Sequence, residues 1–313
     1  MGTQQVGSAP GGHPVYLSTA ALTCEAIVPV NRVKPHTDFR AEIESGLTKM
    51  LTIGLGKEAG ASSLHQAGFS SFGVVLPAAV KVVLSALKVP FGVALLEDSW
   101  HRLHSAEVVR GESLLDRDTA LLEKAWELFG ALPFAEVDVL VLKEMGKTIS
   151  GAGMDPNVTG KFPYEPLPSP TRVSRLVVLD LRDDSGGNAV GLGAADVVTE
   201  RLRQKVDWGH TYANAMASKS LGAARLPLVA STDEKAISVA LLSVVGDRTR
   251  AMKVVAAVNT LDVNQLAATP PLVPAAQAAG YQVVEPNLEA RFDQDGLLAS
   301  IGSLEFFAAG EVT

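Results

Sequence analysis

Three side chains that can move protons or form covalent bonds lie close together near the start of the sequence: His36, Lys49 and His65. Imidazole titrates near neutral pH, so His36, in a polar loop directly after a proline, is suited to act as a general base. A lysine beside apolar residues can lose its proton and become a covalent attachment point, the role we assign to Lys49. His65 follows a glycine-rich segment and could bind a metal through one ring nitrogen.

Each of these residues also has an ordinary interpretation. Lys49 lies in a predicted helix, where most lysines extend their ammonium group into solvent along an apolar stem. Single histidines are more often structural or surface residues than bases or ligands. Local composition alone therefore leaves both interpretations open.

Two further segments extend the candidate site. Gly54, Gly56 and Lys57 belong to the stretch GLGKEAG, where glycine N–H groups and a nearby lysine could hold a phosphate. The spacing matches neither the Walker A pattern nor a dinucleotide fingerprint. Asp155 and Asn157, in SGAGMDPN, predict a turn whose acidic and amide groups could instead bind a polar ligand. We assign these residues to a candidate cofactor-binding site.

The apolar pattern predicts the elements that position these residues. Short apolar runs are typical of strands buried in a parallel sheet, and apolar residues three or four apart are typical of helices. Gly54, Gly56 and Gly60 are expected to end the helix that carries Lys49. We expect strands over 14–17, 26–30, 90–96, 137–142, 173–181, 226–230 and 253–258, and helices over 43–53, 74–87, 113–128, 191–206 and 232–245.

Two of the expected helices begin near side chains that can accept the first backbone N–H groups. Ser231 with Glu234 forms a capping box at the start of the last helix. Asp116 or Asp118 is available to cap the third helix. These polar side chains support the predicted helix starts.

Strands that alternate with helices predict an α/β fold. We expect two α/β lobes, each with a mainly parallel sheet, and a ligand cleft between them. We place the N-terminal lobe, with the cofactor-anchoring lysine, at residues 1–133 and the C-terminal lobe at residues 134–313.

The composition limits the class of protein. The chain has 313 residues, of which 47% are hydrophobic and 19% charged, and a formal net charge of −7, as is typical of a folded protein with a substantial core. Without a basic stripe or a polybasic patch, neither nucleic acid nor a membrane surface is an expected partner. Cys24 is the single cysteine, which excludes an internal disulfide framework and a cysteine-ligated iron–sulfur or zinc site.

Targeting signals are not evident in the sequence. The N-terminus lacks a charged region followed by an apolar one, so it does not resemble a signal peptide. The apolar run at 72–96 is not expected to span a membrane, because it is interrupted by Pro77, Lys81, Lys88 and Pro90. We therefore expect a cytoplasmic protein that acts on a small molecule, and the sequence leaves open whether it forms homo-oligomers.

The order and spacing of the candidate residues resemble those of the nickel-pincer lactate racemase family. Lys34-Pro35-His36 is followed by Ser45-Gly46-x-x-Lys49, and His65 lies sixteen residues beyond the lysine. The stretches NRVKPHTDF, IESGLTKMLTIGLGK and GAGMDPNVTG look like a branch of racemase-like isomerases in that family. The similarity covers nearly the whole chain, from residue 14 to about residue 261.

The resemblance implies a function and a role for each residue. It implies a racemase or epimerase of a 2-hydroxy acid that carries the nickel-pincer nucleotide (pyridinium-3,5-bisthiocarboxylic acid mononucleotide nickel) covalently on Lys49. His65 would then ligate the nickel, and His36 would be a proton-transfer base. In this chemistry the cofactor takes the α-hydrogen as hydride while a histidine removes the hydroxyl proton, and the hydride returns to either face.

Two departures from the family pattern bear on these expectations. The thirteen-residue spacing from His36 to Lys49 is longer than we expect in lactate racemases. We also expect the chain to lack the family's usual N-terminal segment, which contains a Gly-x-His motif and a substrate-binding arginine, and His13 does not match that motif. Two other hypotheses stay open: Lys49 acts as a Schiff-base nucleophile on a carbonyl substrate, or the chain is a non-catalytic family member that binds a ligand or a partner.

Overall fold

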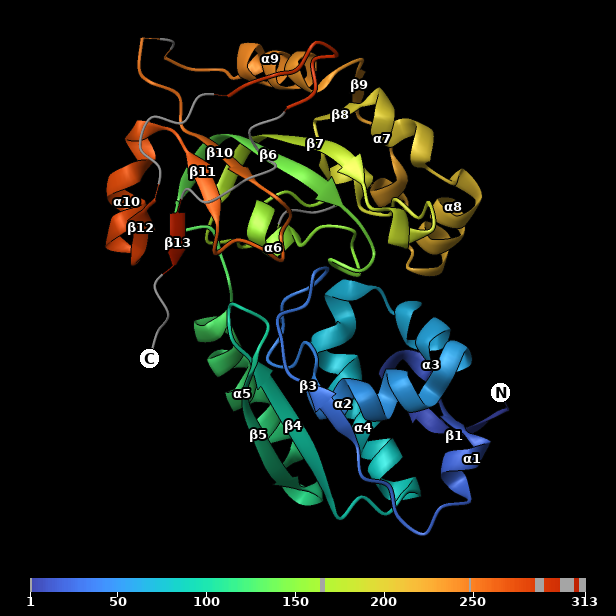
Figure 1. The fold of residues 1–313 in the computed structure, drawn as a ribbon. Helices are drawn as coiled ribbons and strands as arrows, with labels where there is room; N and C mark the ends of the chain where they lie inside the picture. Colours follow the sequence, from blue (N-terminus) through green and yellow to red (C-terminus); the bar gives the residue numbers. More distant parts are fainter. Residues whose placement is uncertain (1, 164–166, 248, 285–289, 299–306, 310–313) are drawn as a thin grey trace. The chain divides into compact units, whose positions relative to one another are not determined.

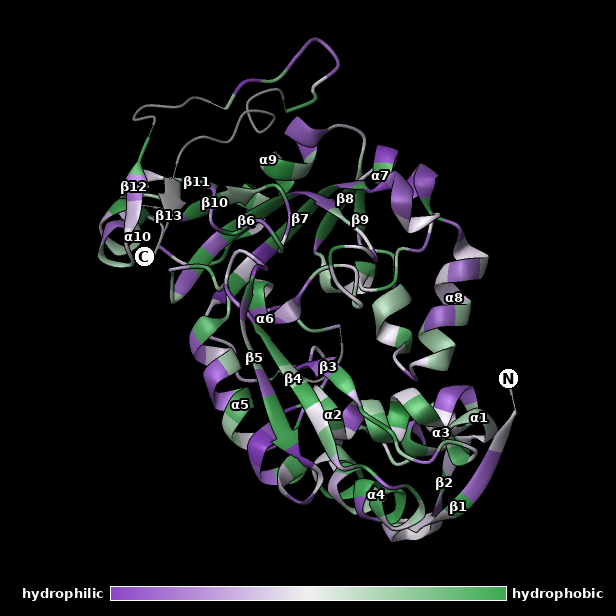
Figure 2. Cartoon of the chain, turned by 60° about the horizontal axis from the view of Figure 1, so that its bottom comes forward, coloured by the Kyte–Doolittle hydropathy of each residue, from purple (hydrophilic) through white to green (hydrophobic). Residues whose placement is uncertain are grey.

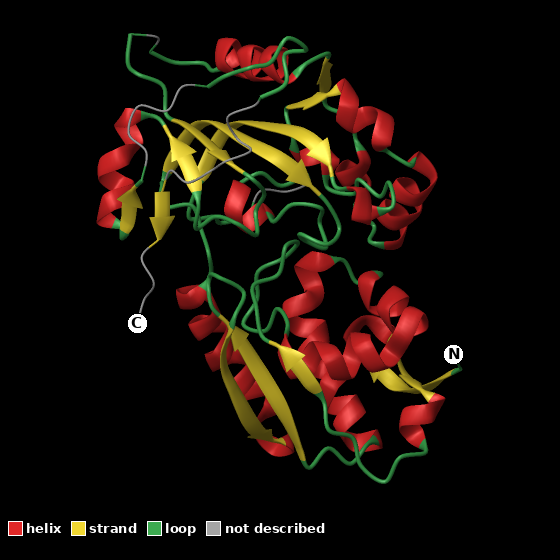
Figure 3. Cartoon of the chain, in the orientation of Figure 1, coloured by secondary structure: helices red, strands yellow, loops and turns green. Residues whose placement is uncertain are grey.

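The computed structural model describes residues 2–163, 167–247, 249–284, 290–298 and 307–309. The chain divides into two compact units, Met1–Phe129 and Gly130–Thr313 (Figure 1). The predicted boundary lies four residues further along the chain. Each unit has its own strands and helices (Figure 3), so each is described by itself.

The second unit is built on a six-stranded sheet with the order β11-β10-β6-β7-β8-β9. Its neighbouring strands run parallel, except that β11 pairs with β10 in the antiparallel direction. The predicted α/β class with a mainly parallel sheet is therefore confirmed. The strands are β6 (Glu136–Met145), β7 (Arg172–Leu181), β8 (Val197–Thr199), β9 (Leu228–Ala230), β10 (Val254–Ala257) and β11 (Leu266–Ala268).

Helices cover both sides of this sheet. Helix α9 packs on β6, β7 and β8, and helix α6 packs on β7 from the other side (Figure 1). Strands covered on both sides need apolar side chains on both, and Val139, Leu140, Leu176 and Val177 of β6 and β7 are fully buried. The remaining elements of the unit are α6 (Pro156–Thr159), α7 (Glu200–Lys205), α8 (Trp208–Ala217), α9 (Asp233–Ser243), α10 (Val273–Ala278), and the antiparallel pair β12 (Tyr281–Val283) and β13 (Phe307–Ala309).

The first unit combines a hairpin, a three-stranded sheet and five helices in its described residues. The hairpin pairs β1 with β2, and the sheet has the order β3-β4-β5. Only the β3–β4 pairing is parallel, so the mainly parallel arrangement belongs to the second unit. The elements are β1 (Thr3–Ala9), β2 (His13–Ser18), α1 (Thr19–Leu22), β3 (Val30–Arg32), α2 (Gly46–Lys49), α3 (Leu55–His65), α4 (Phe72–Ala86), β4 (Phe91–Glu97), β5 (Leu103–Arg110) and α5 (Leu114–Leu128).

The core of the first unit fixes the helix that carries Lys49. Helix α2 packs against α4 and α5, and its apolar residue Leu47, with Leu51 one turn later, is fully buried. Phe72 and Leu76 of α4 belong to the same core. Burying each such side chain stabilises the fold by roughly 1.5–3 kcal/mol, so this core holds α2 at a defined rotation.

Several predicted elements differ in the structure. The strand expected over 26–30 is reduced to β3, which begins at Val30. The helix expected over 191–206 is wrong in its first half, because β8 occupies Val197–Thr199 and α7 begins only at Glu200. Helix α9 is capped by Thr232, whose side chain accepts from the Lys235 N–H at 3.2 Å, and not by the predicted Ser231–Glu234 box.

Helix α4 is the most apolar long helix among the described residues. Figure 2 shows it largely in the hydrophobic colour. The stretch Phe69–Ala86 has the length and hydropathy of a membrane span, although the sequence predicts none there. Its residues Val75, Leu76, Val80 and Val83 are buried in the core of the first unit. A core helix and a membrane span share this length and composition, so the two properties alone do not distinguish them.

Asp138 links β6 to the segment that leads into β10. Its two carboxylate oxygens accept from Nη1 and Nη2 of Arg250, each at 2.6 Å, and the carboxylate also accepts from the Lys253 N–H at 2.8 Å. The hydrogen bonds from Arg250 lower the pKa of Asp138. A carboxylate with a lowered pKa stabilises the folded state above its unfolded pKa, and this contribution is lost as the pH falls through the folded pKa.

We expect Asp138→Asn to destabilise the second unit by about 1–3 kcal/mol at pH 7, because a hydrogen-bonded and nearly buried charge is removed. Below the unfolded pKa of about 4 the difference from the wild type should shrink, since the unfolded wild-type chain then binds a proton that folding must remove, until the folded carboxylate is protonated too. Amide hydrogen exchange in β6, with urea unfolding at pH 7 and pH 3, measures both effects. The exposed neighbour Glu136→Gln is the control and should change little. An equal loss for both variants would contradict this role of Asp138.

Candidate functional site

Lys49 is the last residue of α2 and is partly buried. The chain continues from it into a π-helical turn, Met50–Gly54, and then into α3. Single π-helical turns occur frequently at functional sites, because they redirect the side chains around them. The structure therefore places Lys49 at an irregular point of a longer helical segment.

A carboxylate from α5 fixes the start of this segment. Asp118 Oδ1 accepts from the Leu47 N–H at 3.1 Å, and Oδ2 accepts from the Thr48 N–H at 2.7 Å. The first N–H groups of a helix have no partner within the helix, and a negative charge there is stabilising. Asp118 was expected to cap its own helix, and instead it caps α2, the helix that carries Lys49.

Gly46 allows this contact. Its φ angle is +81°, and a Cβ atom at this position would lie only 2.4 Å from Asp118 Oδ1. A side chain is therefore excluded both by the backbone conformation and by the carboxylate. Ser45, one residue earlier, accepts from the Lys34 N–H and donates to the Lys34 carbonyl, both at 2.6 Å. The Ser-Gly pair of the motif thus holds two segments together beside Lys49.

The hydrogen bonds of His36 define its tautomer. Its Nδ1 accepts from the Asp38 N–H at 3.0 Å. Burial, assisted by the positive charge of Lys49, holds the pKa of His36 well below its usual range. The ring is therefore neutral at pH 7 with its proton on Nε2, and the Asp38 carboxylate, 3.7 Å from Nδ1, would pair only with a protonated ring.

His65 has the opposite tautomer. Its Nδ1 lies 2.6 Å from the Ala61 carbonyl oxygen, and since a carbonyl only accepts, Nδ1 bears the proton. The lone pair of the neutral ring is then on Nε2. A histidine anchored to a carbonyl through one nitrogen is the usual arrangement for binding a metal through the other.

A group of phenylalanines joins the two histidines. The ring of Phe69 lies 6.1 Å from the ring of His36 and 5.7 Å from that of His65, measured between centroids. Phe39 contacts His36 at 4.4 Å, and Phe72 contacts His65 at 5.3 Å. His36 and His65 are therefore brought together on one aromatic wall, although 29 positions separate them in the sequence.

The charge state of Lys49 is unusual for a lysine. Burial lowers its pKa to about 8, against the opposing effect of the Asp38 and Glu44 carboxylates, while Lys34 lowers it further. At pH 7 roughly one amine in ten would then be neutral. Among the described residues, no hydrogen bond or ion pair joins Nζ of Lys49 to another group. The amine is thus able to act as a nucleophile near neutral pH.

The protein side chains alone do not form a metal centre here. Within the described ranges, no three His, Cys, Asp or Glu side chains are grouped so that they could hold a metal ion. His65 is suited to supply one ligand through Nε2, but the described His, Cys, Asp and Glu side chains do not complete a metal centre around it.

The stretch GLGKEAG, which we expected to end the helix and to be able to hold a phosphate, is helical in the structure. Gly54 ends the π-helical turn, and Gly56 and Lys57 lie within α3. A Cβ atom on Gly56 would lie 3.1 Å from the Tyr16 carbonyl oxygen, so this glycine lets α3 approach β2 closely. Lys57 has a φ of +55° and a ψ of −153°, a conformation that costs roughly 1–3 kcal/mol in a residue with a side chain. Whether these residues contact a cofactor stays a prediction.

Asp155 and Asn157 belong to the second unit and have structural roles there. Asp155 Oδ1 accepts from the Asn157 N–H at 2.9 Å and so caps α6, while the Asp155 N–H donates to Thr260 Oγ1 at 2.9 Å. Asn157 is 0% exposed. These contacts explain the turn, and ligand binding by the two residues stays a prediction.

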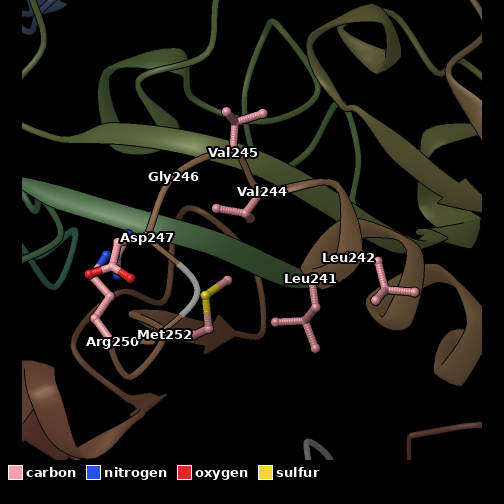
Figure 4. A pocket seen from close by; sticks show the side chains of 8 residues that line it. All are labelled: Leu241, Leu242, Val244, Val245, Gly246, Asp247, Arg250 and Met252. Atoms are coloured by element: carbon pink, nitrogen blue, oxygen red, sulfur yellow. The ribbon is translucent and has the colours of Figure 1, made fainter.

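A hollow of about 270 Å³ lies elsewhere in the second unit, at the end of α9 (Figure 4). Its lining contains no residue predicted for catalysis or cofactor binding. The Arg250 side chain in it is already bound by Asp138, so we do not assign it a function. It is lined by Leu241, Leu242, Val244, Val245, Gly246, Asp247, Arg250 and Met252.

Comparisons with known proteins do not identify a family. No family model matches the sequence, and no curated protein matches it either. One similar solved structure is the lactate racemase apoprotein from Thermoanaerobacterium thermosaccharolyticum, with 13% sequence identity and a TM-score of 0.36. The match covers 56% of this chain and 42% of that one, so this chain spans less than half of its length. The fold and the site thus define the protein only as an α/β protein with a lysine–histidine cluster in its first unit.

Gly46→Ala and Gly12→Ala test the fit between Gly46 and Asp118. Both glycines have a positive φ, +81° and +78°, but a Cβ on Gly12 would meet nothing within 4 Å. We expect Gly12→Ala to destabilise the first unit by about 1 kcal/mol through backbone strain. Gly46→Ala should cost roughly 1–3 kcal/mol more, because Asp118 must move. Urea unfolding measures both values, and equal losses would show that the contact with Asp118 is unimportant.

Proposed function

We propose that the protein is a nickel-pincer-nucleotide-dependent racemase or epimerase of a 2-hydroxy acid. The observation that supports the proposal is that His36 and His65 lie against one group of phenylalanines in the first unit, and that the charge of Lys49 acts on His36. Their order and spacing resemble the family's motifs. The motif names the three residues, and the contacts of the two histidines and the charge of Lys49 support placing them in one site.

Two of these residues would hold the cofactor. Lys49 would form the covalent bond, for which it needs a neutral amine, and burial supplies this near neutral pH. His65 would ligate the nickel through Nε2, with its ring oriented by the bond to the Ala61 carbonyl. When bound, the cofactor supplies a hydride acceptor for the α-hydrogen of the substrate.

His36 would act on the substrate hydroxyl. In the tautomer of the structure its Nε2–H donates, so it can orient the hydroxyl oxygen by a hydrogen bond. The lone pair is on Nδ1 and is engaged by the Asp38 N–H, so removal of the hydroxyl proton requires the ring to give up that bond. His36 in this conformation is therefore a hydrogen-bond donor first, and it can act as the predicted base only after its hydrogen bond with the Asp38 N–H breaks.

One enzymatic alternative rests on the same amine. A lysine with a pKa near 8 in an apolar site is also suited to form a Schiff base with a carbonyl substrate. This reaction requires no metal ion, so His65 would not act as a metal ligand. Borohydride trapping of a substrate on Lys49 in metal-free protein distinguishes this function from the first.

Intact and peptide mass spectrometry with nickel analysis tests the proposal. The protein should be produced together with a pincer-cofactor pathway. We expect a mass increment on the Lys49 peptide and about one nickel per chain, since one histidine and one amine can hold one cofactor. Lys49→Arg should show neither the mass increment nor the nickel, because arginine cannot form the same covalent bond. Lys81→Arg, at an exposed lysine of α4, is the matched control and should keep them.

An unmodified Lys49 without nickel would refute the cofactor assignment, provided that a lactate racemase produced in the same cells is loaded. Nickel bound without an adduct on Lys49 would refute the role of Lys49 as covalent anchor, while His65 could still be a nickel ligand. If neither mark appears but a ligand raises the melting temperature, the chain acts as a binding protein.

A further inference from the structure

Arg40 binds the backbone of the loop that carries His36. Its Nη1 donates to the carbonyl oxygen of His36 at 2.8 Å and to that of Phe39 at 3.1 Å. The Arg40 side chain is only 20% exposed, and a charged group that is largely buried is unfavourable unless it is hydrogen-bonded or paired. The two carbonyls lie at the two ends of a four-residue segment, so a single nitrogen atom holds both ends of this segment.

Two groups hold the guanidinium of Arg40 in place. Its Cζ lies 4.9 Å from the centre of the Trp126 ring on α5, which is a cation–π contact. The carboxylate of Glu44, which is 2% exposed, lies 3.8 Å from Nη1. Helix α5 also provides Asp118, the cap of α2. The same helix therefore supports the lysine helix directly and the histidine loop through Arg40.

Glu44 binds the N–H groups of the same loop. Its Oε2 accepts from the His36 N–H at 2.7 Å, and its Oε1 accepts from the Ala41 N–H at 3.1 Å. Both backbone groups of His36 are therefore bound by side chains, the N–H by Glu44 and the carbonyl by Arg40. The Asp38 N–H, which donates to Nδ1 of the His36 ring at 3.0 Å, lies within the stretch of backbone that these bonds enclose.

We propose that Arg40 is a positioning residue of the candidate site: its hydrogen bonds to the loop backbone keep the Asp38 N–H on Nδ1 of His36 and so fix the tautomer of the ring. In this tautomer Nε2 carries the proton. The inference deepens the proposed function, and it rests on that function only for the catalytic part that His36 would play. The effect on the ring itself belongs to the protein without a cofactor.

Nitrogen-15 NMR of the histidine rings in Arg40→Met, at pH 8 and pH 9, tests the proposal. The His36 ring is neutral there, and its two nitrogen shifts are far apart when one tautomer dominates. Methionine keeps an unbranched apolar stem but offers no donor to the carbonyls. We expect the tautomer with the proton on Nδ1 to rise roughly three- to tenfold, as when one ordinary hydrogen bond is lost. The two shifts should then approach each other equally at both pH values, and His36→Gln identifies the signals.

Arg102→Met is the matched control. Arg102 belongs to the same unit, lies over the Trp100 ring at 6.0 Å, and pairs at 3.0 Å with Asp98, which precedes it by four residues. This variant should leave the His36 shifts as they are in the wild type. If Arg40 only stabilises the fold, Arg40→Met lowers the urea midpoint while the His36 shifts stay unchanged. That outcome, or an equal change of these shifts in both variants, would overturn the proposal.

A measurement on the wild-type protein covers the case in which Arg40→Met does not fold. A guanidinium held by hydrogen bonds rotates slowly, so Nη1 and Nη2 of Arg40 should give separate NMR signals. Those of Arg110, whose side chain is 82% exposed, should be averaged by fast rotation. Averaged signals for Arg40 at the same temperature would also overturn the proposal. Neither experiment needs a loaded cofactor, so a failure of the proposed function leaves the outcome for Arg40 unaffected.

Discussion

The position of Lys49 depends on one interaction, the contact of the Asp118 carboxylate with the start of α2. Two consecutive N–H groups, of Leu47 and Thr48, donate to its two oxygens. Without this carboxylate both donors would be buried without a partner, at a cost of about 1–3 kcal/mol each. Because Leu47 is fixed in the core, the cap and the core together determine the direction of the helix and the place of its lysine.

The residues just before α2 connect this interaction to the histidine loop. Glu44 binds the backbone of His36, Ser45 binds that of Lys34, and Gly46 leaves room for Asp118. Three adjacent residues thus connect the loop, the helix start and α5. The two histidines have opposite tautomers because each is bound by a different local group, an N–H for His36 and a carbonyl for His65. One ring therefore offers a proton at Nε2, and the other offers a lone pair.

The sequence predicts the regular elements well and the polar connections poorly. Strands β4, β6 and β7 and helices α4 and α5 follow from continuous or periodic apolar patterns, which are local signals. The glycines after Lys49 led to a wrong prediction, because they were expected to end the helix. Their low helix propensity is outweighed by the close packing of α3 on the Tyr16 backbone. The partner of Asp118 lies 70 positions away, and no local pattern indicates such a pair. Glu44 was missed for a similar reason, although its place next to the Ser-Gly pair is a signal that could have been used.

The charge of Lys49 acts on the ring of His36, which puts the two side chains in one site of the first unit. The pKa of His36, measured by NMR titration in the wild type and in Lys49→Met, tests it most directly. Burial lowers the pKa of His36 most, and the charged ammonium of Lys49 lowers it further, so removing the ammonium should raise this pKa part of the way toward the ordinary value of histidine. The same His36 titration curve in both proteins would contradict the account, because it would show that the two side chains do not share a site.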